Sequence, residues 1–233
     1  MSTLQVCHLG PTPYRAGLAL QEGLVQARAA GRTGDWLLYP DHPPVLTIGR
    51  QPSDGNIVAD ASTLRARGVE VFEVARGGDV TWHGPGQLVG YLVADLTPRG
   101  RDLHRFLRDL EQSLIDALAG WGVHGERSSG RTGVWVAGEK IASIGVAVRK
   151  WVSYHGFALN VAPELEWFDL IHPCGLRGIS MTSLASRSGG RPPSMAEARQ
   201  GVADALTRVF GYGTWATSGP DEVRRLAMVP NAA

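Results

Sequence analysis

The stretch GVWVAGEKIASIGVAV, residues 133–148, decides the fold. It holds two apolar runs rich in valine and isoleucine, joined by a short segment around Gly138. β-Branched residues favour strands and glycine favours a turn. Two such runs with so short a connection predict a β-hairpin, so at least part of the sheet is antiparallel.

Other apolar runs on both sides of this hairpin predict further strands. Each is rich in β-branched or aromatic residues and is bounded by turn-forming residues. These runs are DWLLYP (35–40), PPVLTIG (43–49), VEVFEV (69–74), QLVGYLVADL (87–96) and WVSYHGFALNV (151–161).

Helices are predicted between the strands. Thr12 followed by Pro13 is typical of a helix start, and that helix is expected to end at Gly31. Ser194 and Glu197 form the pattern of a capping box, and a short helix is expected over 60–67. A further helix after Asp102 is predicted because its apolar residues recur every three or four positions, at Leu103, Phe106, Leu107, Leu110, Leu114 and Leu118.

These elements predict an α+β or mixed α/β fold, with a partly antiparallel sheet flanked by helices. The 233 residues are 43% hydrophobic, which fits one domain over residues 1–233. The tail, 211–233, contains glycine, serine and proline and is expected to pack loosely.

The overall charge and the cysteine count limit the function classes. The net charge is +1, so nothing global favours a nucleic-acid or membrane partner. Two cysteines are too few for a disulfide scaffold and fit a reducing compartment, and no run approaches 18 apolar residues. A soluble cytoplasmic protein is therefore expected.

The glycine-rich stretch RGGDVTWHGPGQ, residues 76–87, is the first candidate for a site. Its glycines miss the spacing of a dinucleotide loop by one residue and precede a strand where that motif needs a helix. A long hairpin connection would explain glycine and proline alone. Arg76, His83 and Gln87 favour a pocket wall instead, because backbone and guanidinium donors can approach a ligand closely there.

The second candidate is HPCGL, residues 172–176, in which Pro173 and Gly175 force a turn around Cys174. Lone cysteines are most often small buried residues, which is the interpretation for Cys7. A turn can direct backbone N–H groups at the sulfur and lower the pKa of the thiol.

A nucleophilic thiol needs a proton partner, and four residues qualify: His83, His155, His172 and Lys140. Lysine is scarce, since only Lys140 and Lys150 occur among 23 basic residues. Lysine can change its protonation state when desolvated and arginine cannot. A lysine in the turn of a hairpin is, by itself, more often a solvated surface residue.

Taken together and in this order, RGGDVTWHGPGQ, GEKIASIG, HGFALNV and HPCGL resemble the lipoyl(octanoyl) transferases, over about residues 36–210. These enzymes move an octanoyl group from acyl carrier protein to a lysine of lipoate-dependent proteins. The resemblance implies the biotin/lipoate protein ligase fold, a mixed sheet with helices packed against it. No metal-binding spacing such as H-E-x-x-H or C-x-x-C occurs, so no metal is expected, and no cofactor is expected either.

Site residues follow by motif from the same resemblance. Cys174 is the implied nucleophile and Lys140 its proton partner. The implied acyl pocket consists of Arg76, Gly77, Gly78, Asp79, Val80, Thr81, Trp82, His83, Ser143, Ile144, Gly145, Gly156, Phe157 and Ala158. Trp82 stands where the family commonly has tyrosine, a change that affects the shape of that wall.

The implied partners are an octanoylated acyl carrier protein as donor and, as acceptors, the lipoyl domains of 2-oxoacid dehydrogenase complexes and the glycine cleavage H protein. Arg101, Arg105 and Arg108 fall at helical spacing and could dock an acidic carrier. Asp102, Asp109 and Glu111 stand nearby, so a solvated mixed face is the stronger interpretation.

The proposed activation can be put in numbers. A thiol with a pKa of about 8.5 is only about 3% thiolate at pH 7. An ammonium about 4 Å away, at an effective dielectric constant near 20, stabilises the thiolate by roughly 4 kcal/mol, or about 3 pKa units. Burial raises the thiol pKa, so the lysine contact must outweigh desolvation.

Three alternatives stay open. One is an ATP-dependent lipoate or biotin protein ligase of the same superfamily, which needs no reactive cysteine. Another is a cysteine hydrolase that uses His83 or His155 as its base with Cys174. The third is an acyl- or cofactor-binding module without catalysis.

Overall fold

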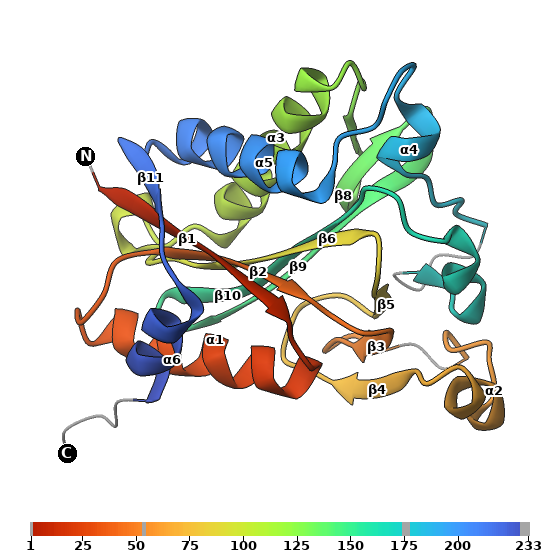
Figure 1. Ribbon diagram of the computed structural model, residues 1–233, viewed down its shortest axis with the longest axis horizontal. Coiled ribbons are helices and arrows are strands. Elements are labelled where there is room, and N and C mark those ends of the chain that lie inside the picture. The colour runs from red at the N-terminus through yellow and green to blue at the C-terminus, as the bar shows by residue number, and fades with distance from the viewer. Residues whose placement is uncertain (1, 53–54, 174–177, 229–233) are drawn as a thin grey trace.

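A large mixed sheet crosses the molecule between two layers of helices (Figure 1). The computed structural model describes residues 2–52, 55–173 and 178–228. Within them the large sheet has eight strands in the order β11-β1-β2-β6-β10-β9-β8-β7. Their bounds are β1 Thr3–Pro11, β2 Trp36–Asp41, β6 Gln87–Val93, β7 Glu126–Ser128, β8 Arg131–Val136, β9 Glu139–Arg149, β10 Val152–Asn160 and β11 Thr214–Thr217.

The predicted hairpin is confirmed as β8 and β9, which pair antiparallel with Trp135 opposite Lys140. From β2 to β7 every neighbouring pair is antiparallel, whereas β11, β1 and β2 run parallel. The mixed α/β fold class is therefore confirmed.

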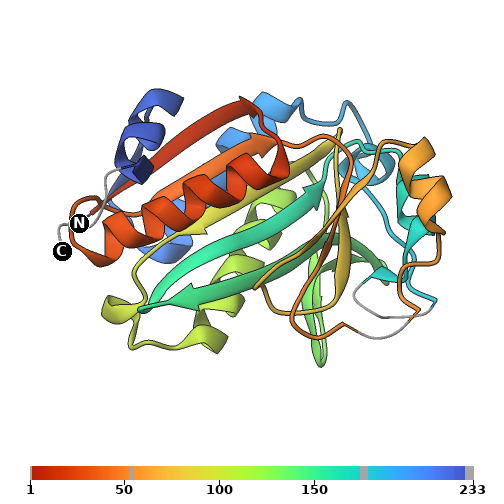
Figure 2. The same ribbon diagram turned by 90° about the horizontal axis from the view of Figure 1, so that it is seen from below.

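Helices cover both faces of this sheet (Figures 1 and 2). α3 (Leu103–Gly120) and α5 (Met195–Phe210) pack on one face, and α1 (Tyr14–Ala29) and α6 (Pro220–Met228) on the other. Leu110, Leu114 and Leu206 belong to the core on the first face, which confirms the apolar periodicity read after Asp102. The short elements are α2 (Ala61–Ala66), α4 (Leu184–Arg187), η1 (Thr97–Arg99) and η2 (Leu165–Leu170).

Most predicted helix starts are confirmed by their caps. The Asp102 side chain accepts a hydrogen bond from the Arg105 N–H at 2.9 Å, and Ser194 and Glu197 form the capping box of α5. The start of α1 differs by one residue. Pro13 has an extended ψ of 142° and takes the cap position, because the Thr12 hydroxyl donates to the Gly10 carbonyl instead.

A second, smaller sheet lies on the α1 side of the large one, in the order β4-β3-β5 (Figure 1). Its strands are β3 Val45–Ile48, β4 Glu70–Glu73 and β5 Val80–His83. β5 is a correction, because no strand was predicted within the glycine-rich stretch 76–87. All four residues of β5 are buried, and pairing with β3 gives their backbone groups partners.

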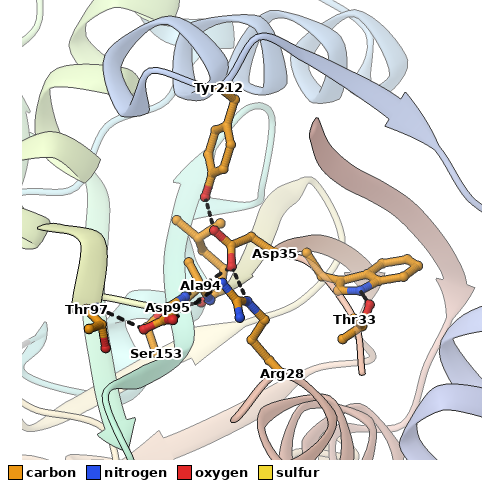
Figure 3. A network of polar contacts seen from close by, with 10 residues as sticks. Arg28, Thr33, Asp35, Ala94, Asp95, Thr97, Ser153 and Tyr212 are labelled. Atoms are coloured by element: carbon orange, nitrogen blue, oxygen red, sulfur yellow. Dashed lines mark hydrogen bonds and ion pairs between the residues drawn. The ribbon is translucent and has the colours of Figure 1, made fainter. Parts of the chain in front are cut away.

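The expectation of a loosely packed tail is wrong for residues 211–228. β11 extends the large sheet beside β1, and α6 packs against α1 with Val223 fully buried. Tyr212 joins a polar network around Asp35 (Figure 3). Asp35 accepts hydrogen bonds from Arg28 Nε at 2.7 Å, the Tyr212 hydroxyl at 2.8 Å and the Asp95 N–H at 3.1 Å. The network therefore ties α1 and the tail to the sheet.

We expect Asp35→Ala to lower the free energy of unfolding by about 2–4 kcal/mol, because three donors lose a largely buried charged acceptor. Urea denaturation of the two proteins measures this difference. The matched control is Asp221→Ala, which removes an exposed ion pair with Arg224 and should cost under about 0.5 kcal/mol. A loss at Asp35 no larger than this control would contradict the network's structural role.

Among the described residues no helix is both long enough and apolar enough to cross a membrane. The same residues hold no group of three or more histidine, cysteine, aspartate and glutamate side chains placed to bind a metal ion.

Candidate functional site

A narrow pocket lies where the small sheet meets the large one, with a cavity volume of about 40 Å³. We call it the central pocket. Three sequence segments far apart in the chain meet there: the loop 76–79 with β5, the middle of β9, and the middle of β10. Its lining residues are Tyr14, Arg76, Gly77, Gly78, Asp79, Thr81, His83, Tyr91, Ser143, Ile144, Gly145, His155, Gly156, Phe157 and Ala158.

Two residues of the predicted pocket, Val80 and Trp82, do not line it. Side chains alternate along a strand, so Thr81 and His83 of β5 face the pocket and their neighbours face away. Trp82 is fully buried on the other side, stacked on Trp167 with ring centroids 5.8 Å apart. Trp82 therefore packs in a core and does not form the wall of the central pocket.

The loop of Gly77 and Gly78 packs tightly on two strands. The Gly77 N–H donates to Val146 of β9 at 2.9 Å, and Gly78 has a φ of +81°, which favours glycine. A side chain at Gly145 would stand 3.1 Å from the Gly77 carbonyl oxygen. Glycine on β9 thus lets the loop lie close above the sheet and cover the pocket.

Arg76 holds this loop in place. Its Nη2 donates to the Thr47 carbonyl at 2.6 Å and to the Thr47 hydroxyl at 2.9 Å, and its Nη1 donates to the Gly77 carbonyl at 3.1 Å. Arg76 was expected to be a polar contact for a ligand. Its buried guanidinium holds the loop and also lines the pocket, so a contact with a ligand stays a prediction.

Aromatic and imidazole side chains form the inner end of the pocket. Tyr91 from β6 and His155 from β10 meet edge to face, and His42 Nε2 lies 2.6 Å from the Tyr91 hydroxyl. Two buried polar atoms that line this pocket, Thr81 Oγ1 and His155 Nε2, have no hydrogen-bond partner among the described residues. Buried polar atoms need partners, so water or a ligand in the pocket must supply them.

A chain of side-chain amides connects this end to the strand that carries Lys140. His83 Nδ1 lies 2.8 Å from Gln87 Oε1, and Gln87 Nε2 donates to Asn160 at 3.0 Å. Asn160 Nδ2 donates to the Thr182 carbonyl, and the Thr182 N–H donates to the Lys140 carbonyl at 2.9 Å. The chain fixes the segment after HPCGL relative to the pocket.

Burial keeps the pocket histidines neutral. It lowers the pKa of His83 and of His155 to about 3 each, and the nearby Arg76 charge acts in the same direction. An imidazole with so low a pKa is a weak general base at neutral pH. The cysteine hydrolase interpretation, which needs His83 or His155 as base, loses support.

These shifts predict that acid destabilises the fold. The unfolded histidines have a pKa near 6.5, so the unfolded state binds protons first as the pH falls below that value. Their contribution to stability is complete above pH 6.5. It should be lost toward pH 3 at roughly 1 kcal/mol per pH unit for each histidine.

Urea denaturation at pH 7, 6 and 5 measures this slope. The variant His155→Asn should reduce it by one histidine's share, and asparagine tolerates the positive φ of 59° at this position. His124→Asn at an exposed site is the control and should keep the wild-type slope. An unchanged slope in His155→Asn would refute the assignment.

Lys140 is buried, with only 1% of its surface exposed, so it is not a solvated turn residue. It lies at the start of β9, and its Nζ is 5.2 Å from the centre of the Trp135 ring. Glycine at 133 leaves room for the side chain, because a Cβ there would stand 2.9 Å from Lys140 Cε. Gly133 and Trp135 on β8 thus form the space that the Lys140 side chain occupies.

A second hollow, which we call the outer groove, contains Lys140 and has a cavity volume of about 360 Å³. It borders the central pocket, because both hollows share the residues Gly77, Gly78, Ile144 and Gly145. The remaining lining residues are Leu103, Leu107, Gly130, Arg131, Thr132, Lys140 and Val146. Lys140 therefore lines the outer groove, and four other residues of that groove also line the central pocket.

Cys174, the expected nucleophile, lies outside the described residues, as do 175–177. The chain on either side of it is placed. The His172 N–H donates to Asn56 at 2.8 Å, and the Lys140 N–H donates to the Ser180 carbonyl at 2.9 Å. The segment that begins six residues after Cys174 therefore runs beside Lys140.

The three arginines considered as a docking face do not form one. α3 begins at Leu103, so Arg101 precedes the helix, and its guanidinium lies 5.7 Å from the centre of the Trp151 ring. Arg108 Nη1 donates to Glu111 at 2.6 Å. These contacts within the protein favour the interpretation of a mixed charged surface.

Sequence reasoning missed Tyr14 and Tyr91 and considered His155 only as a base. Tyr14 and Tyr91 occupy ordinary positions in a helix and a strand, so no local pattern marks them. Had residues 80–83 been predicted as a strand, the alternation of side chains would have placed Thr81 and His83 on one face and Val80 and Trp82 on the other.

Comparison with known proteins identifies the class. Residues 13–207 match the family described as the lipoyl protein ligase A/B catalytic domain. The fold is similar to that of a crystal structure of lipoate-protein ligase A bound with ATP, with a TM-score of 0.79, 17% identity, and coverage of 97% of this chain and 93% of that one. A biotin protein ligase from Aquifex aeolicus matches with a TM-score of 0.51 and 11% identity, covering 91% of this chain and 70% of that one.

Sequence similarity narrows the class further. An octanoyltransferase of Geobacter sulfurreducens is 52% identical over 200 residues, which cover 86% of this chain and 82% of that protein. The chain belongs to the octanoyltransferase family, whose members are acyltransferases of protein lipoylation.

Proposed function

We propose that this protein transfers an octanoyl group from acyl carrier protein to a lysine of lipoyl domains, through a thioester on Cys174. The observation that carries the proposal is the position of Lys140, a buried lysine in the wall of a wide groove that adjoins the narrow central pocket. The chain that follows Cys174 is hydrogen-bonded to the Lys140 backbone.

In the first half of the reaction the Cys174 thiolate attacks the carbonyl carbon of the octanoyl thioester. The bond to the pantetheine sulfur breaks, and the Lys140 ammonium donates a proton to that leaving thiolate. An octanoyl thioester on Cys174 and a neutral Lys140 result. In this proposal the acyl tail enters the central pocket, between the Gly77–Gly78 loop and the strands β9 and β10.

In the second half a lysine amine of the acceptor attacks the Cys174 thioester. Neutral Lys140 takes the proton from that amine, the carbon–sulfur bond breaks, and the Cys174 thiolate returns beside a charged Lys140. Protons and charges balance over the two halves. An amide from a thioester forms downhill, so the proposal requires no ATP.

The proposed donor is an octanoylated acyl carrier protein. The proposed acceptors are the lipoyl domains of 2-oxoacid dehydrogenase complexes and the glycine cleavage H protein. A cytoplasmic site of action remains a prediction from the cysteine count.

An ATP-dependent ligase is the second candidate, because the fold also matches lipoate-protein ligase A bound with ATP. Incubation with octanoyl carrier protein and a lipoyl domain, without nucleotide, separates the two functions. We expect the octanoylated domain in the mass spectrum. A product formed only from free octanoate and ATP would overturn the transferase, and free octanoate released regardless of the acceptor would favour a hydrolase.

A further inference from the structure

A thioester donor has three parts, and each needs a place in the protein. The tail is in the central pocket under the proposed function, and the reacting carbonyl must stand beside Lys140. Tyr14, Tyr91 and His155, which line that pocket, are all buried, so the pocket does not open to the surface past them. The arm that bears the sulfur stays tethered to its carrier, so it must leave by another route.

The outer groove offers that route. It shares the Gly77–Gly78 loop and the Ile144–Gly145 segment of β9 with the central pocket, and it alone of the two contains Lys140. It runs from the reaction centre to the first turn of α3 and the turn between β7 and β8, where Leu103 is 38% exposed and Arg131 is exposed. A chain that enters at this surface reaches Lys140.

The lining of the groove suits a pantetheine arm. Leu103, Leu107 and Val146 supply apolar surface for its methylene and dimethyl groups. Arg131 is the cation of the outer rim, and it forms no ion pair with another described residue.

Charge distinguishes this groove from another hollow near the site. That hollow is lined by Glu166, Asp169 and His172, and its carboxylates would repel a phosphate. The described lining of the outer groove includes no carboxylate. The nearby Glu111 is already engaged, because Arg108, Arg127 and the Gly133 N–H all donate to it.

We propose that the outer groove binds the phosphopantetheine arm of the carrier-bound donor, with Arg131 at its phosphate. This inference rests on the proposed function and assigns the donor side of the same site. An arginine bound to a phosphate through charge-assisted hydrogen bonds contributes about tenfold or more in affinity.

The test compares three octanoyl thioesters that differ only in the arm: phosphopantetheine, pantetheine and N-acetylcysteamine. The formation rate of the octanoyl-enzyme gives kcat/KM for each. Arg131→Ala should lower kcat/KM about tenfold for the phosphopantetheine thioester and for octanoyl carrier protein, and leave the other two within twofold of wild type. Arg149→Ala, at an exposed arginine at the far end of β9, is the matched control and should change none.

A second variant, Leu103→Trp, narrows the groove at an exposed position where the fold tolerates a larger side chain. It should lower kcat/KM for both pantetheine arms and leave the N-acetylcysteamine thioester unaffected. Equal effects of Arg131→Ala on all thioesters, or none on any, would overturn the inference while leaving the transferase intact. A wild-type protein that accepts octanoyl from none of the donors would overturn the proposed function itself.

Discussion

Cys174→Ala should reduce octanoyl transfer by at least about 10⁴-fold and abolish the covalent intermediate, because no other described group can take over as nucleophile in this pathway. The chain's other cysteine, Cys7, is fully buried, and burial raises the pKa of its thiol to about 11. A thiol with that pKa is almost entirely protonated at neutral pH and unreactive.

This contrast supplies the control. Cys7→Ala should retain transfer, apart from a modest loss of stability where the sulfur packs in the core. Rates for both variants come from octanoylation of a lipoyl domain followed by mass spectrometry. Transfer by Cys174→Ala at more than about 1% of the wild-type rate would exclude the thioester on this residue.

The second large effect is expected at Lys140. Lys140→Arg keeps the positive charge that favours the Cys174 thiolate, but arginine cannot become the neutral base that the second half requires. We expect deacylation by the acceptor lysine to fall by about 10²–10⁴-fold. The rate of acylation should fall less. The only cause there is that the larger arginine side chain fits poorly in the space beside Gly133 and Trp135.

Separate measurement of the two halves tests this asymmetry. Lys140→Met has a similar shape and no charge, so it should slow both halves. Lys150→Arg, at the exposed hairpin end, should slow neither. Deacylation by Lys140→Arg at the wild-type rate would reduce Lys140 to an electrostatic neighbour of the thiol.

The sequence predicts those parts of the fold that have local causes. Gly138 between two valine-rich runs predicts the hairpin, and Ser194 with Glu197 predicts the start of α5, because the interacting groups are three to eight residues apart. The pairing of β11 with β1 joins residues at opposite ends of the chain. No local pattern encodes such a contact, so the tail was judged by composition alone.

The same distinction holds at the site. The resemblance assigned three separate segments, which begin at Arg76, Ser143 and Gly156, to one acyl pocket. In the structure all three line the central pocket. The resemblance could not show that the Arg76 guanidinium donates hydrogen bonds to Thr47, because Thr47 is 29 residues away on β3. The second hollow beside Lys140 is also a product of folding, since α3, β8 and β9 each contribute one wall.

The most direct test of the central claim is peptide mapping by mass spectrometry after octanoyl carrier protein is mixed with the enzyme in the absence of acceptor. The account predicts one octanoyl group, held on Cys174 as a hydroxylamine-sensitive thioester and lost when a lipoyl domain is added. An enzyme that transfers octanoate while Cys174 stays unmodified, or with the acyl group on another residue, would contradict it.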